Sequence, residues 1–163
     1  MANVNVESPQ TPLVHIRLAV PDDVPAIVVI EHLSFVHAGE RFGRRRIKYL
    51  IHNPRAVVLV AEQDEKVLAW TAGFAWMRGK EPWGRVYALA VDPVARGQRL
   101  GEQLLNQMIR TLRAQGARPI FLEVNPDNHI AVRLYERNRF AACRALPNYY
   151  GPDRPAARMV QSL

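Results

Sequence analysis

The sequence predicts an α/β protein with a mixed, mostly antiparallel sheet, and three stretches of the chain indicate this class. Val86–Val91 is an almost unbroken apolar run, which is typical of a strand covered on both faces. From Leu100 to Leu112 the apolar residues recur at a helical period, with polar residues between them. Earlier in the chain, Ala56–Gln63 and Val67–Met77 flank a short polar loop, as the strands of an antiparallel hairpin do.

The chain should begin with a tail that is not part of the domain. Residues 1–12 are polar, contain proline and lack periodicity, so we expect them to be flexible. The alternation of apolar and polar residues in Val14–Val20 then predicts a half-buried strand. Because no internal repeat or linker-like stretch follows, residues 13–163 are expected to form a single domain.

Two helices should follow the first strand. Pro21 and the two acids after it are typical of a helix start, and apolar residues carry this helix to about His37. Gly39 ends it, and a second helix is expected from about Glu40 to His52. The densest basic cluster of the chain lies here and contains Arg41, Arg44, Arg45, Arg46 and Lys48. The cluster predicts either a solvated helix face or a basic wall that contacts an acidic acceptor or RNA.

The rest of the chain alternates between strands and helices. Pro119–Val124 is a second apolar strand, and a turn leads from it to a short helix around Ile130–Tyr135. Arg139–Ala145 and Arg158–Leu163 should be the last two strands. Because a helix connects Val86–Val91 to Pro119–Val124, these two strands are expected to be parallel, joined by a right-handed crossover.

Composition narrows the class of protein further. The 163-residue chain is 48% hydrophobic and 23% charged, as expected for a soluble globular domain. No apolar run approaches the ~20 residues that span a membrane, and no signal peptide is recognisable. The single cysteine, Cys143, excludes an internal disulfide, fits a reducing cytoplasm and should be an inert core residue. A net charge of +7 favours an anionic partner, either a phosphate-bearing ligand or a nucleic acid.

The turn between the central strand and the long helix is a candidate phosphate site. It reads Arg-Gly-Gln-Arg-Leu-Gly over residues 96–101. The first N–H groups of a helix lack internal partners, and the helix dipole makes this end partly positive. Glycines let a phosphate approach such N–H groups closely, although the same spacing also suits a tight turn. The motif is neither a Walker loop nor a complete dinucleotide fingerprint.

The central strand, the Val-Asp-Pro at its end, the Arg-x-x-x-x-Gly spacing and the amphipathic helix together resemble the acetyl-CoA-binding motif of the GNAT N-acetyltransferases. The usual motif of that family is Gln/Arg-x-x-Gly-x-Gly/Ala. Arg96 fills its first position and Gly101 its last, whereas Arg99 occupies the position of the middle glycine. The resemblance implies the GNAT fold, in which two central strands splay apart and admit the pantetheine arm of acetyl-CoA.

The C-terminal half more specifically resembles the bacterial ribosomal-protein-alanine N-acetyltransferases. Segments of that family read close to LEV-x-x-x-N…A-x-x-LYE-x-x-GF and NYY, and this chain has LEVNPDNHIAVRLYERNRF and LPNYYG. The likeness covers about Val86–Tyr150 and does not extend well to residues 1–80. Arg139 stands before Phe140 where that family has glycine.

This resemblance implies two catalytic residues. Glu123 falls at the general base of the family, and burial in an apolar strand should raise its pKa, which suits proton abstraction. Tyr135 falls at the general acid, which protonates the departing sulfur. From local sequence alone, Glu123 is equally well a carboxylate paired with an arginine, and Tyr135 is ordinary helix packing. Glu81 is the second choice for the base.

The resemblance also implies where acetyl-CoA and the acceptor bind. The backbone of Leu89–Val91 should meet the pantetheine, and an N–H group there should polarise the acetyl carbonyl. Asn128 should cap the short helix and contact the cofactor. Tyr149 and Tyr150 either line the acceptor mouth or pack as a plain loop. The predicted cofactor-binding residues are Leu89, Ala90, Val91, Arg96, Gly97, Gln98, Arg99, Leu100, Gly101, Glu102, Asn128 and Tyr135.

These features predict an enzyme that moves an acetyl group from acetyl-CoA directly to a primary amine, with a protein N-terminal α-amine as the leading acceptor. A small-molecule amine is the alternative, because residues 1–80 do not carry the resemblance. A non-catalytic basic module that binds RNA or the ribosome is the rival from another class. We expect a cytoplasmic monomer or homodimer without membrane association. We expect no metal site, because the five histidines show no ligand spacing.

Overall fold

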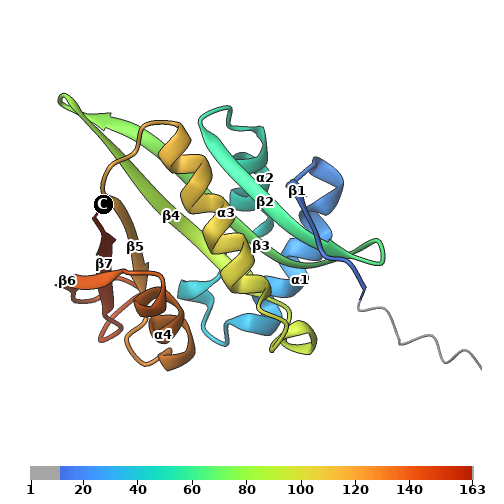
Figure 1. Ribbon diagram of the computed structural model, residues 1–163. Coiled ribbons are helices and arrows are strands. Elements are labelled where there is room, and N and C mark those ends of the chain that lie inside the picture. Colours follow the sequence, from blue (N-terminus) through green and yellow to red (C-terminus); the bar gives the residue numbers. More distant parts are fainter. Residues whose placement is uncertain (1–11, 163) are drawn as a thin grey trace, which may run out of the picture.

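Within residues 12–162, which the computed structural model describes, seven strands form one mixed sheet that carries helices on both faces (Figure 1). The strand order is β1-β2-β3-β4-β5-β7-β6. The strands are β1 (His15–Leu18), β2 (Ala56–Gln63), β3 (Lys66–Arg78), β4 (Glu81–Val91), β5 (Ile120–Val124), β6 (Ala141–Leu146) and β7 (Ala156–Gln161). The helices are α1 (Val24–Ser34), α2 (Arg44–His52), α3 (Leu100–Ala114) and α4 (His129–Arg137). The tail expected over residues 1–12 lies, apart from its last residue, outside the described part.

The two central strands of the sheet are its only parallel neighbours in the described part of the chain. As the sequence predicts, β4 and β5 are connected through α3 and run in the same direction. They pair at only two positions, Gly84 with Ile120 and Arg85 with Phe121. Beyond these pairs the strands diverge, which confirms the splayed centre of the GNAT fold.

The helices pack on the two faces of the sheet according to the alternation of its side chains. In β2, Val57 and Leu59 join the core under α3, whereas Val58 and Val60 join the core under α1 and α2. Figure 1 shows α3 crossing one face, with α1 and α2 behind the sheet. The apolar face of α3 is buried, as its sequence period predicts, except for Ile109, which is partly buried. We therefore distinguish the α3 face, which α4 also covers, from the α1–α2 face.

A β-bulge interrupts the β3–β4 ladder at Tyr87. Ala72 pairs with Ala88 and Gly73 pairs with Val86, so Tyr87 has no opposite residue. Bulges bend a strand and redirect a side chain, and they are common beside active sites. The bulge lies just past the last β4–β5 pair, where it bends β4 at the start of the divergence.

Several boundaries differ from the sequence-based prediction. The central strand begins at Glu81 rather than Val86, because its first residues pair with β3 in a long hairpin whose half-exposed surface needs no apolar run. The second helix begins at Arg44 rather than Glu40. The prediction that Cys143 is a core residue is wrong, because β6 is an edge strand and the thiol is exposed.

A buried carboxylate on α1 anchors the segment between α1 and α2. Glu31 is fully buried, and it accepts hydrogen bonds from the Trp70 indole at 2.9 Å and the Phe42 backbone N–H at 2.8 Å. The second of these bonds holds the chain extended before α2, where the sequence predicts helix. Burial raises the pKa of Glu31 from its ordinary value of 4.5 to about 7, although both hydrogen bonds oppose the shift.

The raised pKa of Glu31 predicts that the free energy of unfolding falls as the pH rises from about 4.5 to about 7. Below this window both folded and unfolded chains carry the proton, and above it the folded protein must bury a charge. The shift corresponds to about 3 kcal/mol. Denaturant unfolding from pH 4 to pH 8 should show this slope in wild type and lose it in Glu31→Gln.

The control for this measurement is Glu136→Gln, which removes an exposed carboxylate on α4. It should keep the wild-type slope. Comparing slopes also cancels the opposite contribution of Asp23, whose pKa is lowered by its bonds to Arg17 and the Val20 backbone despite burial. Parallel pH profiles for wild type and Glu31→Gln would contradict the assignment.

Candidate active site

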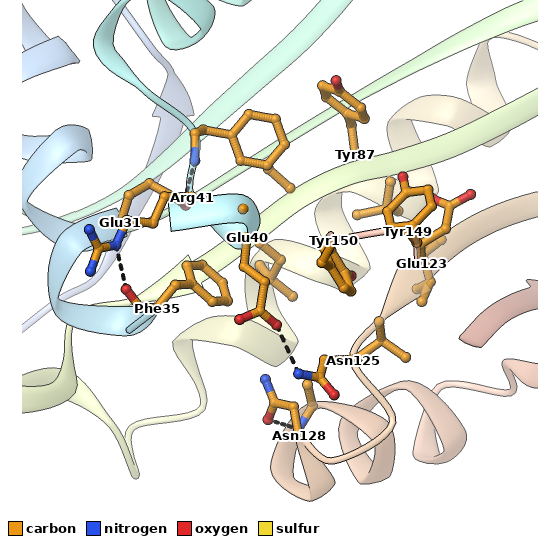
Figure 2. A pocket seen from close by; sticks show the side chains of 18 of the residues that line it. Glu31, Phe35, Glu40, Arg41, Tyr87, Glu123, Asn125, Asn128, Tyr149 and Tyr150 are labelled. Carbon is orange, nitrogen blue, oxygen red and sulfur yellow. Dashed lines mark hydrogen bonds between the residues drawn. The ribbon is translucent and has the colours of Figure 1, made fainter. Parts of the chain in front are cut away.

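A cavity of about 370 Å³ lies where β4 and β5 part. Its walls come from Val86–Leu89 of β4, Leu122–Val124 of β5, the segment Gly39–Gly43 before α2, and the loop that carries Tyr149 and Tyr150 (Figure 2). Because the splay opens the sheet itself, side chains from both of its faces reach this one cavity.

Glu123 reaches the cavity from the α1–α2 face. Its neighbours Leu122 and Val124 join the α3 core, so the alternation of β5 turns Glu123 the other way. Arg85 binds its Oε2 through Nε at 2.9 Å, and Arg158, its partner in the β5–β7 ladder, binds its Oε1 at 3.0 Å. The carboxylate is only 5% exposed, and two guanidinium groups offset the cost of burying it.

Tyr135 reaches the same cavity from the α3 face. It is buried in the core beneath α4, and its ring packs edge-on against Phe140 at 6.0 Å. Burial raises the pKa of its hydroxyl to about 12, so the phenol keeps its proton at neutral pH. Asn128 caps α4 as predicted, because its side chain accepts a hydrogen bond from the Ala131 N–H at 3.2 Å. Asn128 also lines the cavity.

The N-terminus of α3 is open, as the phosphate motif requires. No side chain caps the helix, and the N–H groups of residues 97–102 have no hydrogen-bond acceptor among the described residues. Gly101 lies against Val91 and Leu134, so this helix end packs beside the end of β4 and against α4. The motif residues and Ala90 and Val91 do not line the cavity, whereas Leu89 does.

Arg99 adopts the backbone conformation that the missing glycine would supply. Its φ of 58° and ψ of 26° lie in the left-handed region, at the residue that precedes the first turn of α3. A side chain there costs about 1 kcal/mol. The departure from the family motif therefore strains the turn, because glycine adopts this backbone conformation at lower cost.

Two loops from opposite ends of the chain meet over the cavity. Glu40 accepts hydrogen bonds from Asn125 at 2.9 Å and from Arg154 at 2.8 Å, the first of which Figure 2 shows. A Cβ on Gly39 would clash with the carbonyl oxygen of Tyr150, so the two backbones are in contact. Sequence reasoning missed Glu40 because its partners are 85 and 114 residues away.

The structure brings together Tyr149, Tyr150 and Glu123, but not Glu81. Arg85 donates to the Tyr149 hydroxyl at 2.6 Å as well as to Glu123, and the two tyrosine rings meet edge-on at 4.9 Å. Burial is the main cause that raises the pKa of each tyrosine. Glu81, the second choice for the base, is exposed at the beginning of β4 and does not line the cavity.

Two further properties concern the described residues only. No group of three or more His, Cys, Asp or Glu side chains within residues 12–162 is arranged to hold a metal ion. None of the four helices is long and apolar enough to cross a membrane.

Splayed parallel strands, an uncapped helix after the first of them, and a cavity with a carboxylate and a phenol define a coenzyme-A-dependent acyltransferase fold. The chain belongs to the acetyltransferase (GNAT) family, whose model matches residues 25–140. Members of this family take acetyl-CoA as the acetyl donor.

Curated relatives include mycothiol acetyltransferases. The protein of Propionibacterium freudenreichii subsp. shermanii is 32% identical over 145 residues, which cover 83% of this chain and 45% of the relative. The protein of Streptomyces avermitilis is 33% identical over 150 residues, covering 86% and 47%. The chain thus spans less than half the length of these relatives.

Solved structures agree on the fold. The ribosomal-protein-S18-alanine N-acetyltransferase of Escherichia coli superimposes with a TM-score of 0.78 at 24% identity, over 92% of this chain and 94% of the other. Ard1 of Thermoplasma volcanium gives a TM-score of 0.81 at 24% identity, over 92% and 97%. At this level of identity the likeness establishes the fold alone.

The strain at Arg99 predicts that glycine is the better residue for stability. Arg99→Gly should unfold with a free energy about 1 kcal/mol above that of Arg99→Ala, because both lose the guanidinium but only glycine relieves the left-handed backbone. Denaturant unfolding of the two variants measures this difference directly. Equal stabilities would show that the turn carries no strain.

The contact between the two loops predicts a local effect of Gly39→Ala. The added methyl must push the segment before α2 away from Tyr150, so amide hydrogen exchange should accelerate over residues 35–43 and 147–154. Gly43→Ala is the matched control, because a Cβ at Gly43 meets nothing within 4 Å. Unchanged exchange in Gly39→Ala, or equal changes in both variants, would contradict the contact.

Proposed function

We propose that the protein transfers the acetyl group of acetyl-CoA directly to a primary amine, and that the leading acceptor is an α-amine at the N-terminus of a peptide. One observation carries this proposal: Glu123 and Tyr135 reach the same cavity from opposite faces of the sheet. An amine arriving from the α1–α2 face then meets a carboxylate, and a thioester arriving from the α3 face meets a phenol.

The donor site follows from the open end of α3. The free N–H groups of residues 97–102 bind the diphosphate, with the positive end of the helix dipole behind them. The pantetheine runs along the backbone of Leu89–Val91, and Asn128 contacts it from the start of α4. Leu89 lines the cavity, so this path delivers the thioester to the catalytic pair.

The reaction needs two proton movements around one bond exchange. Glu123 takes a proton from the amine, directly or through one water, on Oε1, which only Arg158 contacts and which therefore keeps a lone pair. The amine nitrogen then bonds to the acetyl carbon. An N–H of β4 near Leu89 or Val91 holds the resulting oxyanion. When the carbon–sulfur bond breaks, Tyr135 gives its proton to the sulfur.

A small-molecule amine is the second candidate acceptor. The similarity to mycothiol acetyltransferases favours it, since these relatives are more similar in sequence than the peptide-modifying neighbours. The fold likeness to the S18-alanine N-acetyltransferase, and to the NatC complex bound to Gag peptide and CoA, supports the peptide reading by analogy. Family membership favours either enzyme over a basic binding module without chemistry.

The exposed thiol of Cys143 fits a reducing compartment, so we propose the cytoplasm as the location of the protein. A monomer or homodimer remains our expectation for its assembly.

Glu123→Gln and Tyr135→Phe test the two catalytic roles. At least one of them should lower kcat by about a hundredfold, because each removes a positioned proton acceptor or donor while keeping its shape. The assay follows release of free CoA thiol from acetyl-CoA with an Ala-initiated peptide, and with a polyamine as the small-molecule acceptor. Calorimetric titration with acetyl-CoA checks that each variant still binds the donor.

The results of these assays distinguish between the two acceptors, the two residue roles and the enzyme function as a whole. Turnover of the polyamine without turnover of the peptide would replace the leading acceptor by the alternative. Wild-type rates in both variants would remove the role assignments. Failure of well-folded protein to bind CoA or acetyl-CoA at millimolar concentration would defeat the enzyme reading as a whole.

A further inference from the structure

The carboxylates that line the cavity already have hydrogen-bond or ion-pair partners within the protein. Glu31 accepts from Trp70 and Phe42, and Glu40 accepts from Asn125 and Arg154. Both oxygens of Glu123 are bound by guanidinium groups. These are the three carboxylates in the wall of the cavity as described. Each carboxylate oxygen therefore already receives at least one hydrogen bond from the protein before the amine substrate binds.

Arg46 is a cation in the same wall whose charge is not matched. It lies on α2, and its guanidinium stacks over the rings of Tyr87 at 5.2 Å and Tyr49 at 5.7 Å. It also donates to the Tyr87 hydroxyl. No carboxylate within residues 12–162 lies within ion-pair distance of it. A guanidinium has five N–H donors, so most of its fork is available to a ligand.

Arg41, the other arginine of the wall as described, and Arg85, which lies outside this wall, differ from Arg46. Arg41 directs its guanidinium to the carbonyl oxygens of Phe35 and Val36 and so closes its own segment. Arg85 is bound to Glu123. The contacts of Arg46 with two tyrosine rings restrict the positions of its guanidinium in advance, which lowers the entropy cost of binding a planar anion.

Arg46 is placed to meet the acceptor and not the donor. Its helix covers the α1–α2 face, whereas the open end of α3 belongs to the opposite face. The guanidinium groups of Arg46 and Arg85 both contact the ring of Tyr87, at 5.2 Å and 4.9 Å from its centre. Arg85 in turn forms an ion pair with Glu123. One ring and one ion pair therefore connect Arg46 to the carboxylate that we assign as base.

We propose that the acceptor carries a carboxylate besides its amine, and that Arg46 binds this carboxylate while the amine lies at Glu123. This inference rests on the proposed function and names its substrate class: an amino acid or a peptide with an acidic residue close to its N-terminus. Charge-assisted bonds from a planar fork to a carboxylate are strong and geometrically selective. The neighbouring Arg44, Arg45 and Lys48 add a general attraction for anions.

The experiment compares acceptors that differ only in one carboxylate. The peptide arm uses Ala-Glu-Ala-amide against Ala-Gln-Ala-amide, and the amino-acid arm uses alanine against alaninamide. Each is assayed for kcat and KM by CoA release, with wild type, Arg46→Gln and Arg45→Gln. Arg45→Gln is the matched control, because it removes the same charge from the same helix at an exposed residue that does not line the cavity.

Wild type should prefer the carboxylate-bearing member of one arm by about tenfold in kcat/KM. Arg46→Gln should abolish the preference by raising the KM of the carboxylate-bearing acceptor, and Arg45→Gln should keep the preference. The arm that shows the preference identifies the source of the carboxylate.

Two results would overturn the inference while leaving the proposed function in place. One is equal kcat/KM for both members of each pair in wild type. The other is the same loss in Arg46→Gln and Arg45→Gln, which would reduce the effect to general attraction. If none of these acceptors is acetylated, the acceptor classes named in the proposed function are wrong. Calorimetric titration of CoA-saturated protein with the same pairs then tests separately whether Arg46 binds a carboxylate. Equal affinities in that titration would refute it.

Discussion

The architecture depends on the early end of the β4–β5 ladder. A continuous sheet keeps its two faces apart, because each strand directs alternate side chains to opposite sides. Here pairing stops after Arg85 and Phe121, and the bulge at Tyr87 bends β4 at that point. Glu123 and Tyr135, which belong to different faces, thereby line one cavity. In the reaction that we propose, the opening lets donor and acceptor enter from opposite sides, so neither obstructs the other.

Where the strands of a sheet separate, the backbone loses its ladder hydrogen bonds, and charged side chains in the opening need other partners. The loops around the cavity accomplish this through polar contacts between distant segments: Glu31 holds Phe42, and Glu40 joins Arg154 to Asn125. Arg85 bridges the two separating strands by binding Glu123 as well as Tyr149. Because these bonds are strong only while water is excluded, the site and its supporting framework depend on the same burial.

Local sequence was sufficient for the elements whose signals are local. The apolar runs of β4 and β5, the period of α3 and the Asn128 cap are confirmed because propensity and packing agree there. The start of α2 and the exposure of Cys143 were missed, since the first depends on Glu31 and the second on β6 lying at the edge. Resemblance brought Glu123 and Tyr135 to attention. The sequence allowed an arginine partner for Glu123, but the identity of Arg85 and Arg158 and the position of Tyr87 depend on register and bulge, which no short window of sequence encodes.

The division of the cavity explains why the resemblance reaches the chemistry but stops short of the acceptor. The likeness is strong within residues 86–150, which contain the turn over residues 96–101, β5, α4 and the loop with Tyr149 and Tyr150. The opposite wall comes from residues 31–46, where it is weak, and this wall contributes Arg46. Physical properties of residues 31–46, their charge above all, are therefore a better guide to the acceptor than similarity over the rest of the chain.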